Sequence, residues 1–276
     1  GLKLINKTPR KCYSRFLSKA DSAVNSQTIA FGIAPKINAA GRMGDARAAL
    51  ALFTAEDENT VFNLATKLTE YNLERQKYCD ELYLSAKQKL KERGAYGRVI
   101  MLWDESWNTG FVGIVAARLA DEYARPVLLF VRNGDVLKGS ARSVESVNVF
   151  EALKACGEWI AEFGGHAQAA GVNVEADNFD KLEEALNEYL SKNYSAEDFE
   201  PTVYVSGKLT AQYSARFAKE LELLEPFGVG NRRPMFEADE GALEVRPVKA
   251  GSPHVNLKSE KIELIYFNGA KYTYLM

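Results

Sequence analysis

Histidine is scarce in this chain of 276 residues, which contains only His166 and His254. Two histidines cannot build a site that needs three, and their wide separation excludes a His-x-x-x-His zinc motif. Cysteine is nearly as rare, because Cys12, Cys79 and Cys156 lie far apart and form no Cys-x-x-Cys pair. This pattern argues against a disulfide framework or a zinc ribbon and predicts a protein of the reducing cytoplasm.

Long apolar runs are absent as well. No run approaches the roughly 18 residues of a membrane span, and no charged-then-apolar leader opens the chain, so we predict no membrane partner. The apolar fraction of 46% and charged fraction of 26% are those of an ordinary folded protein with two or three modules. Because the chain begins at Gly1 in the middle of a pattern, we expect it to be a piece of a longer protein.

An excess of one charge is also missing from the whole chain, which has 35 Lys+Arg against 37 Asp+Glu. The distribution along the chain is nevertheless uneven. Residues 1–50 carry nine Lys/Arg and two Asp/Glu, a net charge of +7, whereas residues 151–200 carry three and twelve, a net charge of −9. We expect a polyanion to bind near the beginning of the chain.

Apolar residues that recur three or four positions apart predict one long amphipathic helix over residues 61–93, ended by Gly94 and Gly97. A buried strand is expected over residues 98–103. The segments expected next are a Gly-rich turn at Gly110 and Gly113, a helix over 112–123, a strand over 127–131, a hairpin turn at Asn133-Gly134, a helix over 150–163, a strand over 171–175 and a helix after an N-cap at Asn178. This alternation predicts an α/β fold.

The polar, acidic residues 191–200 and the following Pro201 are the best linker candidate in the chain. Beyond them, short alternating runs predict a small β domain. The expected strands are 202–205, 235–238, 254–257 and 262–267.

A first cluster that could bind a ligand is Ile33–Arg42. Its small residues at 39–41 allow close packing and leave Asn38 and Arg42 as the groups able to reach a ligand. An arginine in this position can grip a phosphate with two hydrogen bonds. The alternative is a helix start whose alanines pack against a neighbour while Arg42 is simply solvated.

A second cluster is Lys138–Ser143, which follows a predicted strand. Small residues at 139 and 141 remove bulk, and Ser140, Arg142 and Ser143 supply hydrogen-bond donors suited to a terminal phosphate. The Gly-Lys-Ser/Thr order of a Walker loop is missing. An ordinary polar loop is the alternative interpretation.

A third cluster is Phe163–Gly171, in which Gly164 and Gly165 precede His166. Paired glycines allow a substrate to approach the backbone closely. Residues 167–170 can start a short helix whose amide dipoles point toward an anion, and His166 can then donate to a phosphate or transfer a proton. The alternative is a histidine with a purely structural role.

Taken in this order and spacing, the three clusters resemble the RecJ family, single-strand-specific 5′→3′ DNA exonucleases of the DHH phosphoesterase superfamily. Residues 37–42 resemble the Asn-Ala-Ala-Gly-Arg segment near the end of the catalytic DHH domain. Residues 110–119, 139–143 and 164–171 resemble successive motifs of the DHHA1 domain, and residues 224–231 resemble the start of the family's OB-fold domain.

The resemblance implies an α/β fold with a DHHA1-type mixed sheet flanked by helices. A long connecting helix would precede the sheet, and a small β-barrel (OB-fold) domain, expected to be truncated, would follow it. The implied domains are the end of the DHH catalytic domain over 1–55, the connecting helix over 56–94, the DHHA1 domain over 95–193 and the OB-fold nucleic-acid-binding domain over 194–276.

The resemblance also implies a role in DNA repair and recombination. In the family, Mn²⁺ or Mg²⁺ held by the DHH domain activates water against the phosphodiester. His166 would be catalytic, near the scissile phosphate. The contacts to DNA and its 5′ phosphate would come from Asn38, Arg42, Ser140, Arg142, Gly164 and Gly165.

Two departures from the family pattern accompany this resemblance. Asn108 and Thr109 stand where RecJ-like sequences commonly have a histidine and an acidic residue, and no Asp-His-His triplet occurs. We therefore expect the metal ligands to lie upstream, so that this fragment binds no metal and is inactive alone.

The expected partners are single-stranded DNA with a 5′ phosphate, single-stranded-DNA-binding protein and recombination helicases. Three alternatives remain. They are a non-catalytic nucleic-acid-binding or scaffold module, a DHH-family phosphodiesterase acting on short RNA or cyclic dinucleotides, and an aminoacyl-tRNA synthetase with a DHHA1-like tail.

Overall fold

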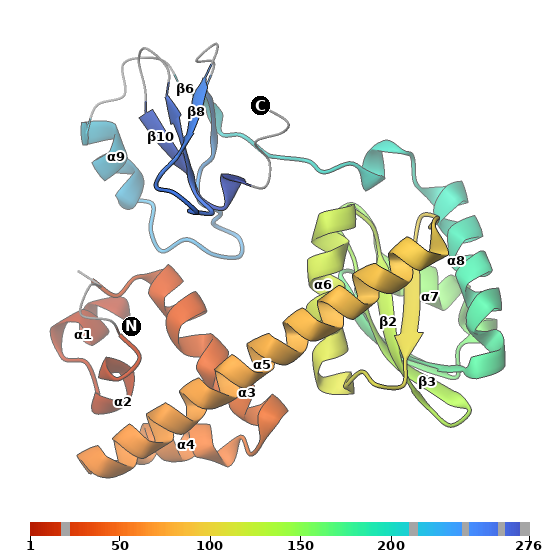
Figure 1. Cartoon of the computed structure of the whole chain (residues 1–276), viewed down its shortest axis with the longest axis horizontal. Helices are drawn as coiled ribbons and strands as arrows, with labels where there is room; N and C mark the ends of the chain where they lie inside the picture. Colours follow the sequence, from red (N-terminus) through yellow and green to blue (C-terminus); the bar gives the residue numbers. More distant parts are fainter. Residues whose placement is uncertain (18–22, 210–214, 239–242, 259–262, 271–276) are drawn as a thin grey trace. The chain divides into compact units, whose positions relative to one another are not determined.

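The computed structural model describes residues 1–17, 23–209, 215–238, 243–258 and 263–270. The chain divides into two compact units, Gly1–Thr202 and Val203–Met276. Figure 1 shows both units and labels many of their helices and strands. In the described part of the chain, no helix is both long and apolar enough to cross a membrane.

The first unit begins with short helices that pack on the first half of a long helix, α5 (Glu58–Arg93). Their shared core includes Ile33, Leu52 and Leu68, and the fully buried Ala40 allows close packing. The short helices are α1 (Leu2–Lys7), α2 (Lys11–Ser14), the π-helix η1 (Thr28–Ile33), α3 (Ala34–Met43) and α4 (Arg47–Thr54).

Helix α5 confirms the long helix predicted from apolar spacing. It begins after Asp57, whose side chain accepts a hydrogen bond from the Thr60 backbone N–H at 2.8 Å. It ends at Gly94, where a φ of +78° favours glycine. The second half of α5 contributes Leu82, Ala86 and other residues to a separate core, so a single helix joins two packed regions.

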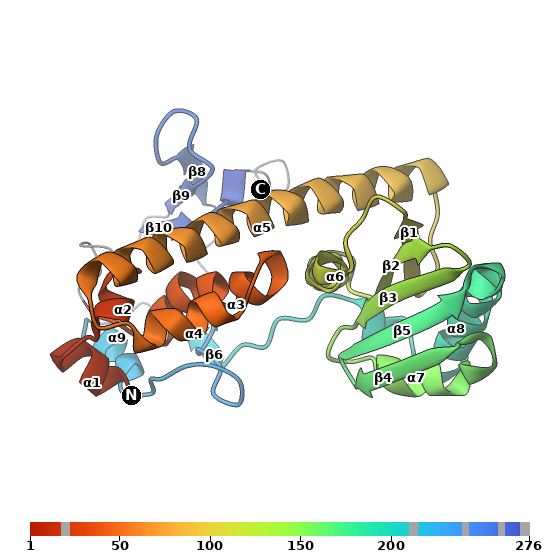
Figure 2. The same cartoon turned by 90° about the horizontal axis from the view of Figure 1, so that it is seen from below.

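A five-stranded mixed sheet forms the centre of the second region (Figure 2). Its order is β1-β2-β3-β5-β4, with β1 parallel to β2 and every other neighbouring pair antiparallel. The strands are β1 (Ile100–Asp104), β2 (Val127–Asn133), β3 (Val136–Arg142), β4 (Glu162–His166) and β5 (Ala169–Glu175).

Helices cover both faces of this sheet. Alternate residues of β1 enter different cores, so that Ile100 packs with α5 and α6 (Thr109–Tyr123) while Met101 packs with α7 (Val149–Ala155) and α8 (Phe179–Asn193). Burial on both faces explains why β1 and β2 read as continuous apolar runs. Helix α6 packs on β2 and β3. On β4 and β5, the paired residues Gly164 and Gly171 are exposed, so this part of the sheet is less covered.

Some local predictions for this region need correction. Gly110 and Gly113 lie inside α6 and not in a turn, because Asn108 caps the helix by accepting a hydrogen bond from the Gly110 N–H. The helix predicted over 150–163 ends at Ala155 and is followed by the 3₁₀ turn η2 (Gly157–Trp159) and then by β4. The hairpin predicted at Asn133-Gly134 is confirmed, since β2 pairs antiparallel with β3 across a Gly134 with φ of +63°.

Residues 191–200, the predicted linker, belong to the first unit, and the division between the two units falls just after them, between Thr202 and Val203. Helix α8 extends to Asn193, the turn η3 (Ala176–Asn178) leads into it, and its N-cap Asn178 makes no side-chain capping bond. The turn η4 (Glu197–Phe199) also packs within the first unit, where Phe199 is buried against Tyr194 and beneath the Arg98 guanidinium. Burial of this one ring anchors an otherwise polar, acidic segment.

The second unit contains a three-stranded antiparallel sheet of order β10-β9-β8 and a parallel pair, β6 with β7. The strand predicted over 202–205 is wrong, because these residues are exposed and not in a strand, and β6 begins only at Gly207. Residue 262 of the last predicted strand lies outside the described residues. The elements are β6 (Gly207–Leu209), α9 (Ala215–Glu222), β7 (Phe236–Ala238), β8 (Glu244–Pro247), β9 (Val255–Lys258) and β10 (Glu263–Tyr266).

Candidate nucleic-acid interface

The first cluster, Ile33–Arg42, covers nearly all of α3 from its N-cap Ile33, and Asn38 and Arg42 lie in the second half of that helix. Asn38 and Arg42 are one helical turn apart and exposed, whereas Ala39 and Ala40 between them are fully buried. The Arg42 Nη1 donates a hydrogen bond to the backbone carbonyl of Gly110 in the first turn of α6, at 2.5 Å. This bond brings the end of α3 to the beginning of α6.

The second cluster lies within strand β3 up to Arg142, and only Ser143 follows the end of the strand. Ser140 and Arg142 are two residues apart and therefore point to the same face of the sheet. Arg142 Nη1 donates to Ser140 Oγ at 2.8 Å and to the Ala141 carbonyl at 2.7 Å. Gly113 of α6 faces both side chains, because a Cβ placed on it would lie 2.9 Å from Arg142 Nη2 and from Ser140 Oγ.

Arg42 and Arg142 are close enough for their charges to interact. Burial lowers the pKa of Arg142, and the positive charge of Arg42 lowers it further. Within the described residues, neither guanidinium forms an ion pair with a carboxylate. Two neighbouring cations without a counter-ion create a local positive field, which an anion with several oxygens would relieve.

The third cluster forms the end of β4 and the turn into β5. The short helix predicted over 167–170 is wrong, since residues 167 and 168 form a turn and Ala169 and Ala170 belong to β5. Pairing with β5, itself paired with β3, imposes the hairpin. At Gly165 φ is +156°, and a Cβ there would lie 2.2 Å from the Ala169 carbonyl oxygen, so the backbones approach too closely for another residue.

Strand register places the second and third clusters on one face of the sheet. Residues directly opposite one another on β3, β5 and β4 form rows across the sheet. One row contains Arg142, Ala169 and His166, and a second contains Ser140, Gly171 and Gly164. Small residues therefore separate Arg142 from His166, and both Gly164 and Gly171 are exposed. At about 4.8 Å per strand spacing, the backbone of His166 lies roughly 10 Å from that of Arg142, on the other side of Ala169.

Most of the predicted residues thus gather around the beginning of helix α6. Arg42, Ser140 and Arg142 surround the first turns of α6, whereas Asn38 lies one turn further back on α3. Ser143 Oγ is buried and has no hydrogen-bond partner in the part of the chain that the structure describes. Gly110 and Gly113 also belong to this site, although the sequence alone did not indicate it; their spacing of three within an apolar helix was the available signal.

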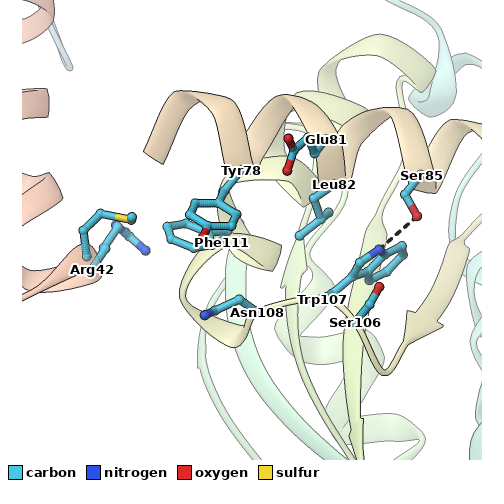
Figure 3. Close-up of a pocket in the computed structure, with 10 residues that line it drawn as sticks. Arg42, Tyr78, Glu81, Leu82, Ser85, Ser106, Trp107, Asn108 and Phe111 are labelled. Carbon is cyan, nitrogen blue, oxygen red and sulfur yellow. Dashed lines mark hydrogen bonds between the residues drawn. The ribbon is translucent and has the colours of Figure 1, made fainter. Parts of the chain in front are cut away.

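A cavity of about 640 Å³ adjoins this group at Arg42 (Figure 3). Tyr78 and Phe111 lie parallel within it, with ring centroids 5.6 Å apart. Trp107 Nε1 donates to Ser85 Oγ at 3.1 Å and holds the loop before α6 against α5. The lining residues are Arg42, Met43, Tyr78, Glu81, Leu82, Ser85, Ser106, Trp107, Asn108 and Phe111.

The resemblance to the RecJ family implies Mn²⁺ or Mg²⁺, which would need a cluster of metal-ligating side chains. Among the described residues, no three or more His, Cys, Asp or Glu side chains gather closely enough to hold a metal ion. The residues of this group are instead cationic or neutral donors, which bind anions. They do not fit a metal centre, and we assign no step to a metal here.

Family models match most of the chain in two blocks. Residues 94–192 match the DHHA1 domain, and residues 208–275 match the RecJ OB domain. The first block contains α6, β3 and the Gly164–His166 segment.

Curated relatives agree with these matches. The chain is 30% identical over 279 residues to the single-stranded-DNA-specific exonuclease RecJ of Bacillus subtilis, covering 97% of this chain and 36% of that protein. It is 31% identical over 214 residues to the RecJ of Thermus thermophilus, covering 75% of this chain and 30% of that protein. The chain therefore spans about a third of each of these two relatives.

Solved structures give the same result. The crystal structure of Thermus thermophilus RecJ in complex with Mg²⁺ superposes with a TM-score of 0.80 at 27% identity, covering 96% of this chain and 41% of that one. The Mn²⁺ complex of the same protein also has a TM-score of 0.80. Sequence, domain order and fold agree, and the chain belongs to the RecJ family.

Proposed function

We propose that this chain is the part of a single-stranded-DNA-specific 5′→3′ exonuclease that binds the 5′ end of the strand. The observation that carries the proposal is the approach of two guanidinium groups to the start of α6, where Arg42 bonds to the Gly110 carbonyl and Arg142 lies against Gly113, and neither has a carboxylate partner in the described part of the chain. A terminal phosphate is the group that such a pair recognises best, because its several oxygens can satisfy both arginines.

The residues around the arginines have complementary roles in this proposal. Ser140 Oγ, which already accepts a hydrogen bond from Arg142, donates its own proton to a phosphate oxygen. Gly113 leaves room for the Arg142 guanidinium beside α6. The DNA strand then runs over the exposed end of β4, where Gly164 and Gly165 allow the DNA backbone to approach the sheet.

His166 lies on β4, in the same row across the sheet as Arg142 on β3. An exposed imidazole two strands from the terminal phosphate is placed to donate to, or exchange a proton at, the next phosphodiester along the strand. Asn38, exposed one turn before Arg42 on α3, contributes a neutral donor from the opposite side.

The domain assignment is also part of this proposal. Residues 1–55 are the end of a DHH catalytic domain, 56–94 the connecting helix, 95–193 the DHHA1 domain and 194–276 the OB-fold domain. Manganese or magnesium ligands then lie in the portion of RecJ proteins that this chain does not cover. We therefore expect no hydrolysis of DNA by this chain alone.

The OB domain supplies further contacts to the strand. Exposed aromatic and apolar side chains in the second unit include Tyr204 and Phe267, and the Arg233 guanidinium lies 4.9 Å from the Phe227 ring centroid. Aromatic rings and arginine planes stack with any base, which suits a sequence-independent enzyme.

The cellular setting is proposed on other grounds. Three buried, free cysteines suit a reducing cytoplasm. Action in DNA repair and recombination, together with single-stranded-DNA-binding protein and recombination helicases, follows from the family resemblance alone.

A fluorescence anisotropy titration tests the central part of the proposal. The 276-residue chain is titrated with one 3′-labelled single-stranded oligonucleotide, with and without a 5′ phosphate. We expect tighter binding of the phosphorylated strand by about tenfold, the value of one charge-assisted contact of about 1.5 kcal/mol. Equal affinity for the two strands would contradict the phosphate site, and digestion of either strand by the chain in Mn²⁺ would contradict the missing-ligand assignment.

A further inference from the structure

We propose that the cavity between α3, α5 and the start of α6 binds the nucleoside of the 5′-terminal nucleotide, and that its base stacks on Tyr78. This inference rests on the proposed function, because Arg42 both lines the cavity and bonds to the first turn of α6, against which Arg142 of the phosphate site also lies. It adds a base-binding subsite to a site so far defined by phosphate contacts alone.

Helix α6 connects the cavity to the phosphate site, because the arginines of both lie against its first turns. Arg42 bonds to the carbonyl of Gly110, and Arg142 contacts Gly113 one helical turn further on. Residues three apart on a helix lie about 5–6 Å from each other. A phosphate held between the two guanidiniums would therefore place its attached sugar within reach of the cavity that begins at Arg42.

The Tyr78 ring is a prepared stacking platform. Phe111 is only 3% exposed and is fixed in the core, and Tyr78 lies on it with an interplanar angle of 5°. Tyr78 itself is 51% exposed, so a large part of its ring is still open to a third aromatic group. Stacking of this kind accepts every base, as an enzyme that removes successive nucleotides requires.

The size and polarity of the cavity suit a nucleoside. Its volume of about 640 Å³ falls within the range of small-molecule sites. In Figure 3, Arg42 lies at one end, next to Tyr78 and Phe111, whereas Ser85 and Trp107 lie at the other end.

Glu81 orients the ligand within this cavity. It lies one turn beyond Tyr78 on the same face of α5, and its contact with Lys77 is a long, exposed one of 3.9 Å. The carboxylate therefore remains available to accept hydrogen bonds from a base edge, while its charge keeps the phosphate at the Arg42 end.

Oligonucleotides with and without a terminal base test this subsite. Both 3′-labelled strands carry a 5′ phosphate, and their terminal nucleotide is either thymidine or a tetrahydrofuran abasic analogue. We expect the base-bearing strand to bind the chain about tenfold more tightly, within the range of base–aromatic stacking. Tyr78→Leu, which keeps apolar packing on Phe111, should abolish the difference, and Tyr78→Phe should preserve it.

Controls separate this inference from the proposed function. Leu84→Ala alters an exposed apolar residue of α5 outside the cavity and should leave the difference between the strands intact. Equal binding of the two phosphorylated strands by the unmodified chain, with the preference for a 5′ phosphate retained, would overturn the base subsite alone. Persistence of the tenfold difference in Tyr78→Leu would overturn the role of Tyr78. Loss of the phosphate preference itself would instead contradict the proposed function.

Discussion

Gly113 of α6 lies directly against the guanidinium group of Arg142 on β3. A Cβ at Gly113 would be 2.9 Å from Arg142 Nη2 and 3.4 Å from its Cζ. Gly110, one turn earlier, accepts the hydrogen bond from Arg42. Two arginines from different elements therefore reach one short surface of the helix, where burial and the positive charge of Arg42 lower the pKa of Arg142.

Substitution of Gly113 by alanine should disturb the phosphate site more than the fold. The atoms nearest to the added methyl group are the ends of flexible side chains, so Arg142 and Ser140 can move away while α6 stays in place. We expect Gly113→Ala to weaken the preference for 5′-phosphorylated over unphosphorylated strands by about fivefold or more, measured by anisotropy. The matched control is Gly157→Ala, because no atom lies within 4 Å of its added Cβ. An unchanged preference in Gly113→Ala would show that Arg142 does not act from its observed position.

The two glycines of the Gly-Gly-His segment should differ in their tolerance to substitution. At Gly165 an added Cβ would meet backbone atoms of Ala169 and Ala170, which cannot move aside, and φ is +156°. We expect Gly165→Ala to lower the free energy of unfolding by about 1–3 kcal/mol. Gly164→Ala has open space at its Cβ and should change it by less than about 1 kcal/mol. Urea unfolding followed by tryptophan fluorescence compares them, and equal losses would refute the assigned close approach.

Local patterns in the sequence predicted the elements better than they predicted the site. The apolar spacing of α5, the buried run of β2 and the Gly134 turn depend on neighbouring residues, which a sequence shows directly. The helix expected at 167–170 failed because pairing between β3 and β5 determines that segment, and these strands are distant in sequence.

The site depends on similar long-range relationships. Arg142 and His166 share a row only because of the register of β3, β5 and β4. The approach of Arg42 to Arg142 requires α3 and α6 to meet, which no local pattern indicates. The sequence therefore indicates which side chains can bind a phosphate, whereas only the fold shows how these side chains are arranged in space.

The buried thiol of Cys156 should make stability sensitive to alkaline pH. Burial raises the pKa of Cys156 to about 11, with the nearby Glu158 and Glu188 contributing further. Because the folded state then holds this proton more tightly than the unfolded state, the stabilisation is complete below the ordinary value of 9.0 and is lost as the pH rises through about 11. Cys156→Ala should therefore flatten the fall in the free energy of unfolding between pH 9 and 11. An identical slope in the variant would contradict the raised pKa.

The side chain of Asn108 should stabilise the beginning of α6. It accepts a hydrogen bond from the Gly110 N–H at 2.8 Å as the N-cap of the helix. We expect Asn108→Ala to lower the free energy of unfolding by about 1 kcal/mol, and Asn108→Ser, which can also cap, to lower it by clearly less. Urea unfolding curves of the two variants provide the measurement, and equal losses would indicate that capping is not the role of this residue.

Recognition of a 5′ phosphate by Arg142 is the central property of the proposed site, and a double-mutant cycle measures it. Affinities of the unmodified chain and of Arg142→Ala are determined for the same oligonucleotide with and without its 5′ phosphate, at one salt concentration. We predict a coupling free energy of about 1.5–3 kcal/mol between the arginine and the phosphate, with little effect of the substitution on the unphosphorylated strand. A coupling free energy near zero, with both strands weakened equally, would show that Arg142 contacts DNA without reading its 5′ end.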